Sequence, residues 1–316
     1  MVFRGLRGGL AVALFTVCCL YNQATLAQPP AKALELVVLG SGGPGATGRA
    51  GAGYLVLIDG DPRILVDAGP GTFVRVGEAH LSLEDTDIVL LTHLHVDHAS
   101  GIAGLFKARA VSGAEHTVFN VWGPAGSGAH RRGAYFPSTS QFMDLLFGSH
   151  GAFAYLREFA SPLDIRAHNI PAAAAYPAAV QIIFDSGDIV IKAVAGHHSD
   201  APAIIYRIEH AGRSITFSGD IDAHGLAGLR AIAQGSDLLV FNSVVRDPPG
   251  SRSVLYELHT PPRAIGEIAR DAGVGHLLLS HLSPAVEAHR QEVLESIREN
   301  YARPVDFAED GLRVSP

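Results

Sequence analysis

The stretch "THLHVDHAS", residues 92 to 100, decides how the rest of the chain is interpreted. It places three histidines and an aspartate within six positions, directly after the apolar run "DIVLL". A lone histidine is usually a surface residue or a satisfied core residue, and the chain has 16 histidines. A cluster is different, because imidazole nitrogens and carboxylate oxygens are the donors that zinc prefers. The stretch therefore predicts four donors of a metal site, namely His93, His95, Asp97 and His98.

Further candidate ligands stand at the ends of three other apolar runs. "AVAGHHSD" ends one run with His197 and His198, "TFSGD" ends another with Asp220, and "LLLSH" ends a third with His281. Ligands at successive strand ends, far apart in the sequence, are typical of a metal site on the rim of a sheet. A carboxylate has two oxygens, so it can be shared by two ions. The donors fit one ion on His93, His95 and one downstream histidine, a second ion on Asp97, His98 and His281, and Asp220 between them.

The pattern of apolar runs predicts a layered α/β protein with helices outside its sheets. Strand-like runs form a meander first and alternate with helices later, and no linker or charge run divides them. We expect strands at 34–40, 53–60, 63–69, 87–93, 117–124, 188–197, 214–220, 237–242 and 276–281, and helices at 100–110, 138–148, 263–273 and 287–301. The Ala- and Pro-rich stretch 168–180 is expected to be an exposed loop or the edge of a lid.

A glycine motif near the first strand is a false lead. Gly40, Gly42 and Gly45 match G-x-G-x-x-G, and Asp67 follows about 20 residues later, as in dinucleotide-binding sites. That fingerprint must open a helix, whereas Pro44 and further glycines lead here into a predicted hairpin that turns at "DGDP". We therefore expect a glycine-rich loop beside the metal site and no residues that bind an organic cofactor.

The chain resembles the metallo-β-lactamase superfamily, whose defining motif is the H-x-H-x-D-H seen at residues 93–98. The resemblance covers essentially all of residues 28–316 and implies an αββα sandwich, in which two mixed β-sheets are flanked by helices. Within the superfamily the chain looks most like the ribonuclease Z and arylsulfatase-type branch. That likeness rests on "LGSGGPGATGRAGAGYLVLIDGDPRILVDAGPGT" and on "LHTPPRAIGEIARDAGVGHLLLSHLSP".

The resemblance implies two Zn²⁺ per chain, which would lower the pKa of a bridging water so that hydroxide attacks the substrate near neutral pH. Family members similar in "PAIIYRIE" place the third histidine ligand four residues before the proline, here Pro202, which favours His198 over His197. Asp97 would also orient the nucleophile. His259 resembles the histidine of the branch's H-x-T loop and would protonate the leaving oxygen; the alternative is a structural histidine before a helix, with Thr260 as a cap.

Departures from other branches narrow the expected chemistry. The commonest class of β-lactamases has a cysteine where Asp220 stands, and residues 28–316 contain no cysteine. Lactonase-like members usually carry a T-P-G-H stretch that "GHHSDAPA" lacks. The leading expectation is hydrolysis of a small anionic phosphodiester or sulfate ester. The alternatives are a lactonase or β-lactamase-type hydrolase of cyclic esters or amides, and a catalytically silent protein that uses the metal scaffold for binding.

The first 27 residues read as a secretory signal, with Arg4 and Arg7 before the apolar "LAVALFTVCCL" and a small-residue cleavage site before Gln28. This predicts a single hydrolase domain at 28–316, periplasmic or secreted, without a stable membrane span after cleavage. Removal of the two arginines takes the formal net charge from −7 to −9. An acidic surface disfavours long nucleic acids as partners, although Arg131 and Arg132 could form a local basic spot. The sequence does not decide whether the protein forms homo-oligomers.

Three smaller expectations concern residues around the ligands. Asp67 in "VDAG" is expected to support a metal-bound histidine rather than to bind metal itself. Asn242 either faces the site or forms a turn. The aromatic residues after the first motif are expected to pack in the core or a lid, and they are Phe106, Phe136, Phe142, Phe147, Phe153 and Tyr155.

Overall fold

The structure is a computed structural model that describes residues 1–2, 34–112, 116–127, 135–159, 161–172, 179–199 and 201–316. The predicted signal segment, residues 1–27, lies outside the described residues except for its first two positions, as do Arg131 and Arg132. The described residues from Leu34 to Pro316 belong to one compact unit. None of the helices in the described ranges is both long and apolar enough to cross a membrane.

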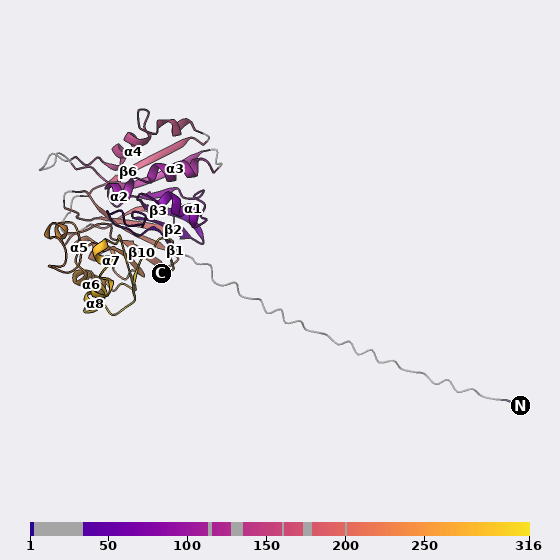
Figure 1. Cartoon of the computed structure of the whole chain (residues 1–316). Helices are drawn as coiled ribbons and strands as arrows, with labels where there is room; N and C mark the ends of the chain where they lie inside the picture. Colours follow the sequence, from indigo (N-terminus) through magenta and orange to yellow (C-terminus); the bar gives the residue numbers. More distant parts are fainter. Residues whose placement is uncertain (3–33, 113–115, 128–134, 160, 173–178, 200) are drawn as a thin grey trace. The chain divides into compact units, whose positions relative to one another are not determined.

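Fourteen strands in the described residues form two seven-stranded sheets (Figure 1). The first sheet has the order β14-β1-β2-β3-β4-β5-β6, and its strands β3 to β6 are parallel. Strands β3 and β4 are near-continuous apolar runs, as expected where both faces of a sheet are covered, whereas β6 is a polar and mostly exposed edge strand. The bounds are β1 (Leu34–Gly40), β2 (Gly53–Ile58), β3 (Asp61–Ala68), β4 (Ile88–Leu90), β5 (Thr117–Pro124), β6 (Leu163–Ile170) and β14 (Arg313–Val314).

The second sheet has the order β13-β12-β11-β10-β9-β8-β7. Strands β10 to β13 are parallel, and β8 and β9 continue the sheet in antiparallel fashion. Because β8 is antiparallel to β9 and β9 to β10, β8 runs in the same direction as β10. The bounds are β7 (Gln181–Asp185), β8 (Ile189–Ala195), β9 (Ile204–His210), β10 (Arg213–Phe217), β11 (Leu238–Asn242), β12 (His276–Ser280) and β13 (Val305–Phe307).

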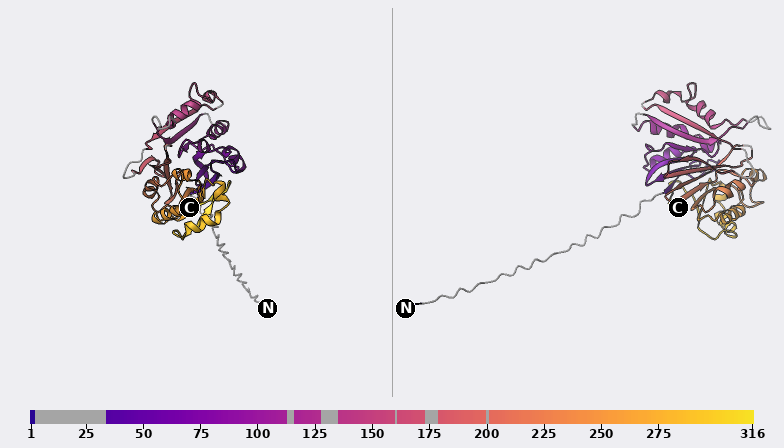
Figure 2. Two further views of the ribbon diagram at one scale, coloured as in Figure 1. Left: turned by 60° about the vertical axis from the view of Figure 1, so that its left-hand side comes forward. Right: turned by 180° about the vertical axis from the view of Figure 1, so that it is seen from behind.

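Three apolar cores separate four layers. One core holds side chains from both sheets, such as Val56 and Ile191, and therefore lies between them. A second packs the first sheet against helices before residue 150, and a third packs the second sheet against later helices. The two groups of helices lie on opposite sides of the paired sheets (Figure 2). This αββα arrangement confirms the predicted fold class.

The helices vary in length from one turn to about three. Helix α6 begins with Pro262 in its first turn, a position that suits proline because the missing N–H would have no helical partner. The bounds are α1 (Thr72–Glu78), α2 (Val96–Ala99), α3 (Ile102–Ala110), α4 (Thr139–Phe147), α5 (Leu226–Ile232), α6 (Pro262–Asp271), α7 (Pro284–Glu287) and α8 (Arg290–Arg298), with 3₁₀ turns η1 (Ala154–Glu158) and η2 (Ser253–Glu257).

The predicted hairpin joins β2 to β3. Its two-residue turn is Asp59 and Gly60, both with positive φ (53° and 97°), as a tight turn between twisted strands requires. The glycine motif before it opens no helix, because residues 41–52 are irregular. The glycine motif therefore lacks the helix that a dinucleotide-binding fingerprint requires.

A carboxylate far along the chain fixes the irregular loop at residues 41–50. Asp310 accepts hydrogen bonds from the backbone N–H and the hydroxyl of Ser41 at 3.0 and 2.7 Å, 269 positions earlier. Its other oxygen accepts from the backbone N–H of Ala50 at 2.8 Å and from Nε of Arg75 at 3.0 Å. Since β14 also pairs with β1, this later segment holds the loop against the first sheet.

Two buried tyrosines join the sheets across the central core. Tyr54 on β2 donates its hydroxyl to Oγ of Ser280 on β12 at 2.8 Å. Tyr206 on β9 donates to the carbonyl oxygen of Leu91, just after β4, at 3.0 Å. Burial raises the pKa of both phenols above the usual value, so both remain donors. The first bond runs from the first sheet to the second, and its acceptor, Ser280, precedes His281 by one residue. The second bond runs from the second sheet to the first, and its acceptor, Leu91, precedes His93 by two residues.

Candidate metal centre

The predicted ligands meet at one edge of the two sheets, beyond the ends of parallel strands. Strand β4 leads into His93 and His95, and the short helix α2 carries Asp97 and His98. In the second sheet, β8, β10 and β12 run in the same direction and end at this edge, so the residues after them come together. Those residues are His198, Asp220 and His281.

Oxygen Oδ2 of Asp220 lies at the centre of the cluster. The Asp220 side chain is 4 % exposed, and histidine nitrogens surround this oxygen at similar distances. Such spacing leaves room for an ion between the donors, since zinc binds nitrogen and oxygen at about 2.0–2.2 Å. The distances are 3.9 Å to Nε2 of His93, 3.6 Å to His98, 3.7 Å to His198, 3.6 Å to His281 and 4.0 Å to Nδ1 of His259.

The donors fall into overlapping groups whose ligand atoms lie within 4.8 Å of one another. One group is His93, His95 and His198, and another is Asp97, His98 and His281, which are the two sets expected from the sequence. Asp97 lies beside the second histidine of its group, with Oδ2 3.1 Å from Nε2 of His281. Asp220 groups with members of both sets, as a shared ligand would.

Hydrogen bonds at Nδ1 orient three of the imidazoles. His98 donates from Nδ1 to Oδ2 of Asp67 at 2.8 Å, and His198 donates to the carbonyl oxygen of Leu258 at 2.8 Å. Nδ1 of His93 lies 3.1 Å from the Thr92 hydroxyl, whose own proton goes to Asp67 at 2.7 Å. When such a ring is neutral with Nδ1 protonated, its lone pair is on Nε2, which faces the cluster.

Two residues near the ligands lie where the sequence left alternatives. Asp67 contacts His98 and Thr92 and is not among the grouped donors, as a supporting carboxylate would be placed. Asn242, at the end of β11, donates from Nδ2 to Oδ1 of Asp220 at 2.7 Å. It therefore faces the site, and it occupies the oxygen of Asp220 that points away from the histidines.

The geometry separates His198 from His197. His198 is buried and joins His93 and His95, whereas the side chain of His197 is 35 % exposed and belongs to none of the donor groups. Nδ1 of His197 donates instead to Oδ2 of Asp222 at 2.6 Å. The spacing argument for His198 agrees with this placement.

The local charges keep the carboxylates ionised and one histidine neutral. Burial would raise the pKa of Asp220, but His281, His98 and His259 around it outweigh burial and hold that pKa well below the usual range. Burial would also raise the pKa of Asp97, but the hydrogen bond from His281 and the charges of His98 and His281 lower it to about 2. Burial and the neighbouring His98 lower the pKa of His93 well below 6.5.

Besides the type of the donors, buried nitrogen atoms without hydrogen-bond partners indicate that the cluster could bind a metal. Nε2 of His93 and Nε2 of His98 are buried and have no hydrogen-bond partner in the described structure. A buried polar atom without a partner is costly, so such atoms are rare unless something binds them. Two unpartnered nitrogens beside an ionised carboxylate match the nitrogen and oxygen donors of a zinc site.

His259 lies against the same cluster, between η2 and α6. Its side chain is 5 % exposed, and its Nδ1 is buried without a hydrogen-bond partner in the described residues. Burial lowers its pKa to about 4, despite the opposing charge of Asp220. Thr260 does not cap α6, which begins after Pro261; its hydroxyl donates to the carbonyl oxygen of Ile221. The capping alternative for Thr260 is therefore wrong.

Glycines allow the backbone around the ligands to pack closely. A Cβ on Gly69 would lie 2.2 Å from the carbonyl oxygen of Asp97, and one on Gly51 would lie 2.7 Å from the same atom. A Cβ on Gly43 would lie 3.2 Å from Nδ1 of His281. Asp67 and His281 themselves adopt positive φ of 54°, a costly conformation for these residues. The glycine-rich loop thus supports the ligands through backbone contact.

Two residues that sequence reasoning did not single out contact the site. Thr92 connects His93 to Asp67, and Asp222 holds His197. Both lie within two residues of a predicted ligand, which is the only sequence signal that marks them. Among the aromatic residues expected in a core or lid, Phe106 and Phe147 are buried in the core, whereas Phe136 lies with its ring 5.8 Å from that of His95.

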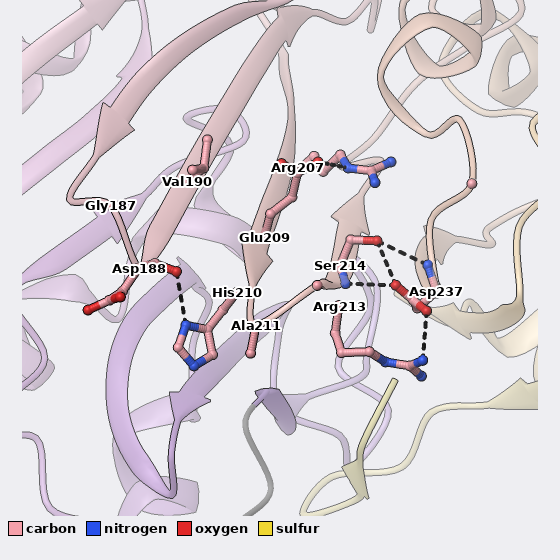
Figure 3. A pocket seen from close by; sticks show the side chains of 12 residues that line it. Gly187, Asp188, Val190, Arg207, Glu209, His210, Ala211, Arg213, Ser214 and Asp237 are labelled. Carbon is pink, nitrogen blue, oxygen red and sulfur yellow. Dashed lines mark hydrogen bonds and ion pairs between the residues drawn. The ribbon is translucent and has the colours of Figure 1, made fainter.

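A cavity of about 400 Å³ adjoins the cluster at His198. A second cavity, of about 410 Å³, lies at the turn between β9 and β10, the opposite ends of the strands (Figure 3). Four of its charged side chains pair with one another, Arg207 with Glu209 at 2.6 Å and Arg213 with Asp237 at 3.0 Å. Of these two cavities among the described residues, the first lies next to a predicted ligand.

Comparisons with known proteins agree with this geometry. The profile of the family described as "Beta-lactamase superfamily domain" matches residues 62–282. A curated protein named Ribonuclease Z from Mycobacterium sp. (strain KMS) is 27 % identical over 293 residues, which is 89 % of this chain and 95 % of that protein.

Solved structures show the same fold at lower identity. The short form of human tRNase Z has a TM-score of 0.65 at 20 % identity, with 89 % of this chain and 99 % of that chain covered. Zn²⁺-bound PqqB from Methylobacterium extorquens has a TM-score of 0.60 at 16 % identity, covering 89 % and 100 %. At such identities the likeness concerns the fold alone.

Proposed function

Because the chain belongs to the beta-lactamase superfamily, we propose that it is an exported dinuclear zinc hydrolase of phosphodiester or sulfate ester substrates. The observation that carries this proposal is the position of Asp220. Five histidine nitrogens lie 3.6–4.0 Å from its Oδ2, and they come from both predicted ligand sets and from His259. A carboxylate placed between two sets of donors suits two ions better than one.

His93, His95 and His198 would hold one ion, Asp97, His98 and His281 the other, and Asp220 both. When bound, two zinc ions supply Lewis acidity toward the substrate oxygens and a nucleophile from water near neutral pH. The chain's own contribution is to fix the donors. Asp67 and the carbonyl of Leu258 orient imidazoles, and Asn242 holds Asp220 through its outer oxygen. Fixed donors lose little orientational freedom when substrate binds.

Asp97 and His259 are the residues proposed to act on the reacting groups. Asp97 keeps a pKa of about 2, so it is ionised near neutral pH and can orient the attacking water by accepting a hydrogen bond from it. His259, with a pKa of about 4, is neutral near pH 7. It would therefore assist a leaving oxygen mainly by donating a hydrogen bond, and by proton transfer from its small protonated fraction.

We propose both the type of bond that is hydrolysed, a phosphodiester or sulfate ester, and the size of the substrate, a small molecule rather than a long RNA. Curated relatives named Ribonuclease Z fit a small anionic ester poorly, since their name implies RNA. The formal charge of −7 for the whole chain points the other way, because a strongly acidic protein repels the phosphate backbone of a long nucleic acid. We therefore keep small phosphodiesters and sulfate esters as the proposed substrates, and residues 1–27 as the basis for proposing export.

Metal analysis of the purified protein tests the centre. We expect about two zinc ions per chain, and fewer than one tightly held ion without gain on reconstitution would contradict the proposal. Asp220→Ala should abolish turnover and weaken both ions together, because it is the one shared ligand in the proposed map. Retention of both ions and of turnover in Asp220→Ala would show the map to be wrong.

A substrate panel on the zinc-loaded protein tests the reaction. It should contain an aryl phosphodiester, an aryl sulfate, an acyl-homoserine lactone and a cephalosporin, and we expect the phosphodiester to be hydrolysed fastest. Lactone or cephalosporin hydrolysis at least tenfold faster would favour the alternative branches. A protein that holds two zinc ions and turns over none of the four would favour a binding role.

A further inference from the structure

His197 and Asp222 form a pair beside the metal centre that the proposed reaction does not use. The Asp222 side chain is 4 % exposed, and its oxygens accept from Nδ1 of His197 at 2.6 Å and from the backbone N–H groups of Ser199 and His224 at 3.2 and 2.8 Å. An ionised carboxylate can only accept, so His197 donates from Nδ1. In the neutral ring, Nε2 then carries the lone pair.

Nε2 of His197 has no hydrogen-bond partner among the residues that the structure describes. The ring lines the cavity of about 400 Å³ that adjoins His198. Because Asp222 fixes the other nitrogen, the ring cannot turn freely to satisfy Nε2 elsewhere. Because Nδ1 is turned to Asp222, Nε2 is the ring nitrogen that remains for a group bound in the cavity.

The rest of the cavity lining is small and mainly apolar. It includes Ala125, Gly126, Pro171, Ala172 and Ala201, with Ser127 and Ser199 as further polar residues. No lysine, arginine, aspartate or glutamate belongs to the described lining. A small and mainly apolar lining suits a compact apolar group. The volume is in the range of small-molecule sites.

We infer that His197 is a specificity residue, whose Nε2 accepts a hydrogen bond from a hydroxyl or N–H group on a compact, otherwise apolar arm of the substrate. Asp222 acts through His197 as a positioning residue. The inference deepens the proposed function and rests on it, because the cavity becomes a substrate pocket only if the reaction occurs at the neighbouring cluster. It narrows the ester substrates to those with an uncharged arm that carries one donor.

Paired substrates with the same leaving group test the inference. The three 4-nitrophenyl hydroxybenzyl phosphates, with the hydroxyl at position 2, 3 or 4, are compared with their methoxy counterparts on the zinc-loaded full chain. We expect at least one hydroxyl isomer to exceed its methoxy partner about tenfold in kcat/KM, mainly through KM, as one hydrogen bond allows. Equal values for all three pairs would overturn the inference.

His197→Asn is the decisive variant, because the asparagine amide can still donate to Asp222 but has no group in the position of Nε2. The preference for the hydroxyl substrate should fall to about one, and the zinc content should match that of the native protein. His276→Ala is the matched control, since His276 forms another histidine–aspartate pair, with Asp306 at 2.8 Å, at the opposite ends of the strands. It should keep the preference. A preference that survives in His197→Asn would overturn the inference.

A binding measurement separates failure of this inference from failure of the proposed function. If no phosphodiester is turned over, the dissociation constants of the three cresols and the three methoxytoluenes are measured by ligand-observed NMR. At least one cresol should bind the native protein about tenfold more tightly than its methoxy partner, and His197→Asn should remove the difference. Absence of that difference in the native protein would overturn the inference whatever the reaction.

Discussion

At the scale of single residues, His259 offers a test of how the leaving group is assisted. His259→Ala should slow hydrolysis of an alkyl ester far more than hydrolysis of an activated nitrophenyl ester, because a good leaving group needs no donor. General acid assistance typically contributes ~10²–10⁴-fold in rate. The measurement is kcat for both esters on zinc-loaded protein, together with the zinc content. Equal losses on both esters, or lost zinc, would assign His259 a structural or ligand role.

The lowered pKa of His259 predicts acid sensitivity of the metal-free protein. Between pH 6.5 and about 4 the unfolded chain protonates this histidine but the folded protein does not, so the free energy of unfolding falls as the pH falls through this window. The full loss is roughly 3 kcal/mol, from 1.36 kcal/mol per pKa unit. His259→Gln removes the group and should reduce the dependence by that amount. Urea unfolding of both chelator-treated proteins at pH 7 and pH 4.5 measures it, and parallel pH profiles would contradict it.

At the scale of elements, the turn after β3 and the loop before β2 support the ligands through close backbone packing. Gly69→Ala places a Cβ 2.2 Å from the carbonyl oxygen of Asp97 and 2.5 Å from the backbone of Gly51, so one of these segments must move. We expect a loss of stability on the order of 2–4 kcal/mol and weaker zinc binding. Thermal unfolding and chelator competition measure the two effects.

Gly77→Ala is the control for that substitution. Gly77 lies within α1, and a Cβ there meets no atom within 4 Å. Alanine should therefore stabilise the protein by roughly 0.5–1 kcal/mol, as glycine-to-alanine changes do within helices. Similar destabilisation by both substitutions would show that close packing against Asp97 is not the cause.

The same scale shows what sequence patterns can and cannot predict. Buried strands such as β1 and β12 are predicted because their apolar runs are continuous. Strand β6 was missed because "LDIRAHNI" is polar and mostly exposed; eight register pairs with β5 stabilise it instead. Strands β7, β9, β13 and β14 and helices α1, α2, α5 and α7 were also not predicted, since most are short. Stretch 168–180 was expected to be a loop, but residues 168–170 belong to β6, and 173–178 lie outside the described residues.

For the site, the sequence predicts the type of donor and the strand ends that bring the donors together. It cannot predict which imidazole turns inward, because that depends on distant partners. His198 meets the carbonyl of Leu258, 60 positions away, and His197 meets Asp222. The supporting role of Thr92 likewise appears only when β3 and β4 are paired. That each of these residues binds a metal ion stays a prediction, which the metal analysis described above tests.

At the scale of the whole molecule, the two crossed tyrosine bonds hold the sheets together beneath the cluster. Tyr206→Phe removes a hydroxyl that is fully buried and leaves the carbonyl of Leu91 without its donor. We expect a loss of about 1–3 kcal/mol in the free energy of unfolding and a lower zinc affinity, because donors from the two sheets are then held less firmly. Urea unfolding and zinc competition measure both.

Tyr135→Phe is the matched control, since that hydroxyl bonds to Gln141 at the surface. It should change the free energy of unfolding by no more than about 0.5 kcal/mol. If Tyr206→Phe proves equally mild, the bond between the sheets does not stabilise the protein.

The hydrogen bonds of Asp310 have a consequence for biosynthesis. Ser41 leaves the ribosome 269 residues before its partner is made. At about 5–20 residues per second, the loop around Ser41 waits on the order of ten to fifty seconds for the carboxylate that fixes it. During that interval the nascent chain cannot complete the loop that packs Gly43 against His281. We therefore expect the site to fold late, which gives a chaperone that long to bind the incomplete chain.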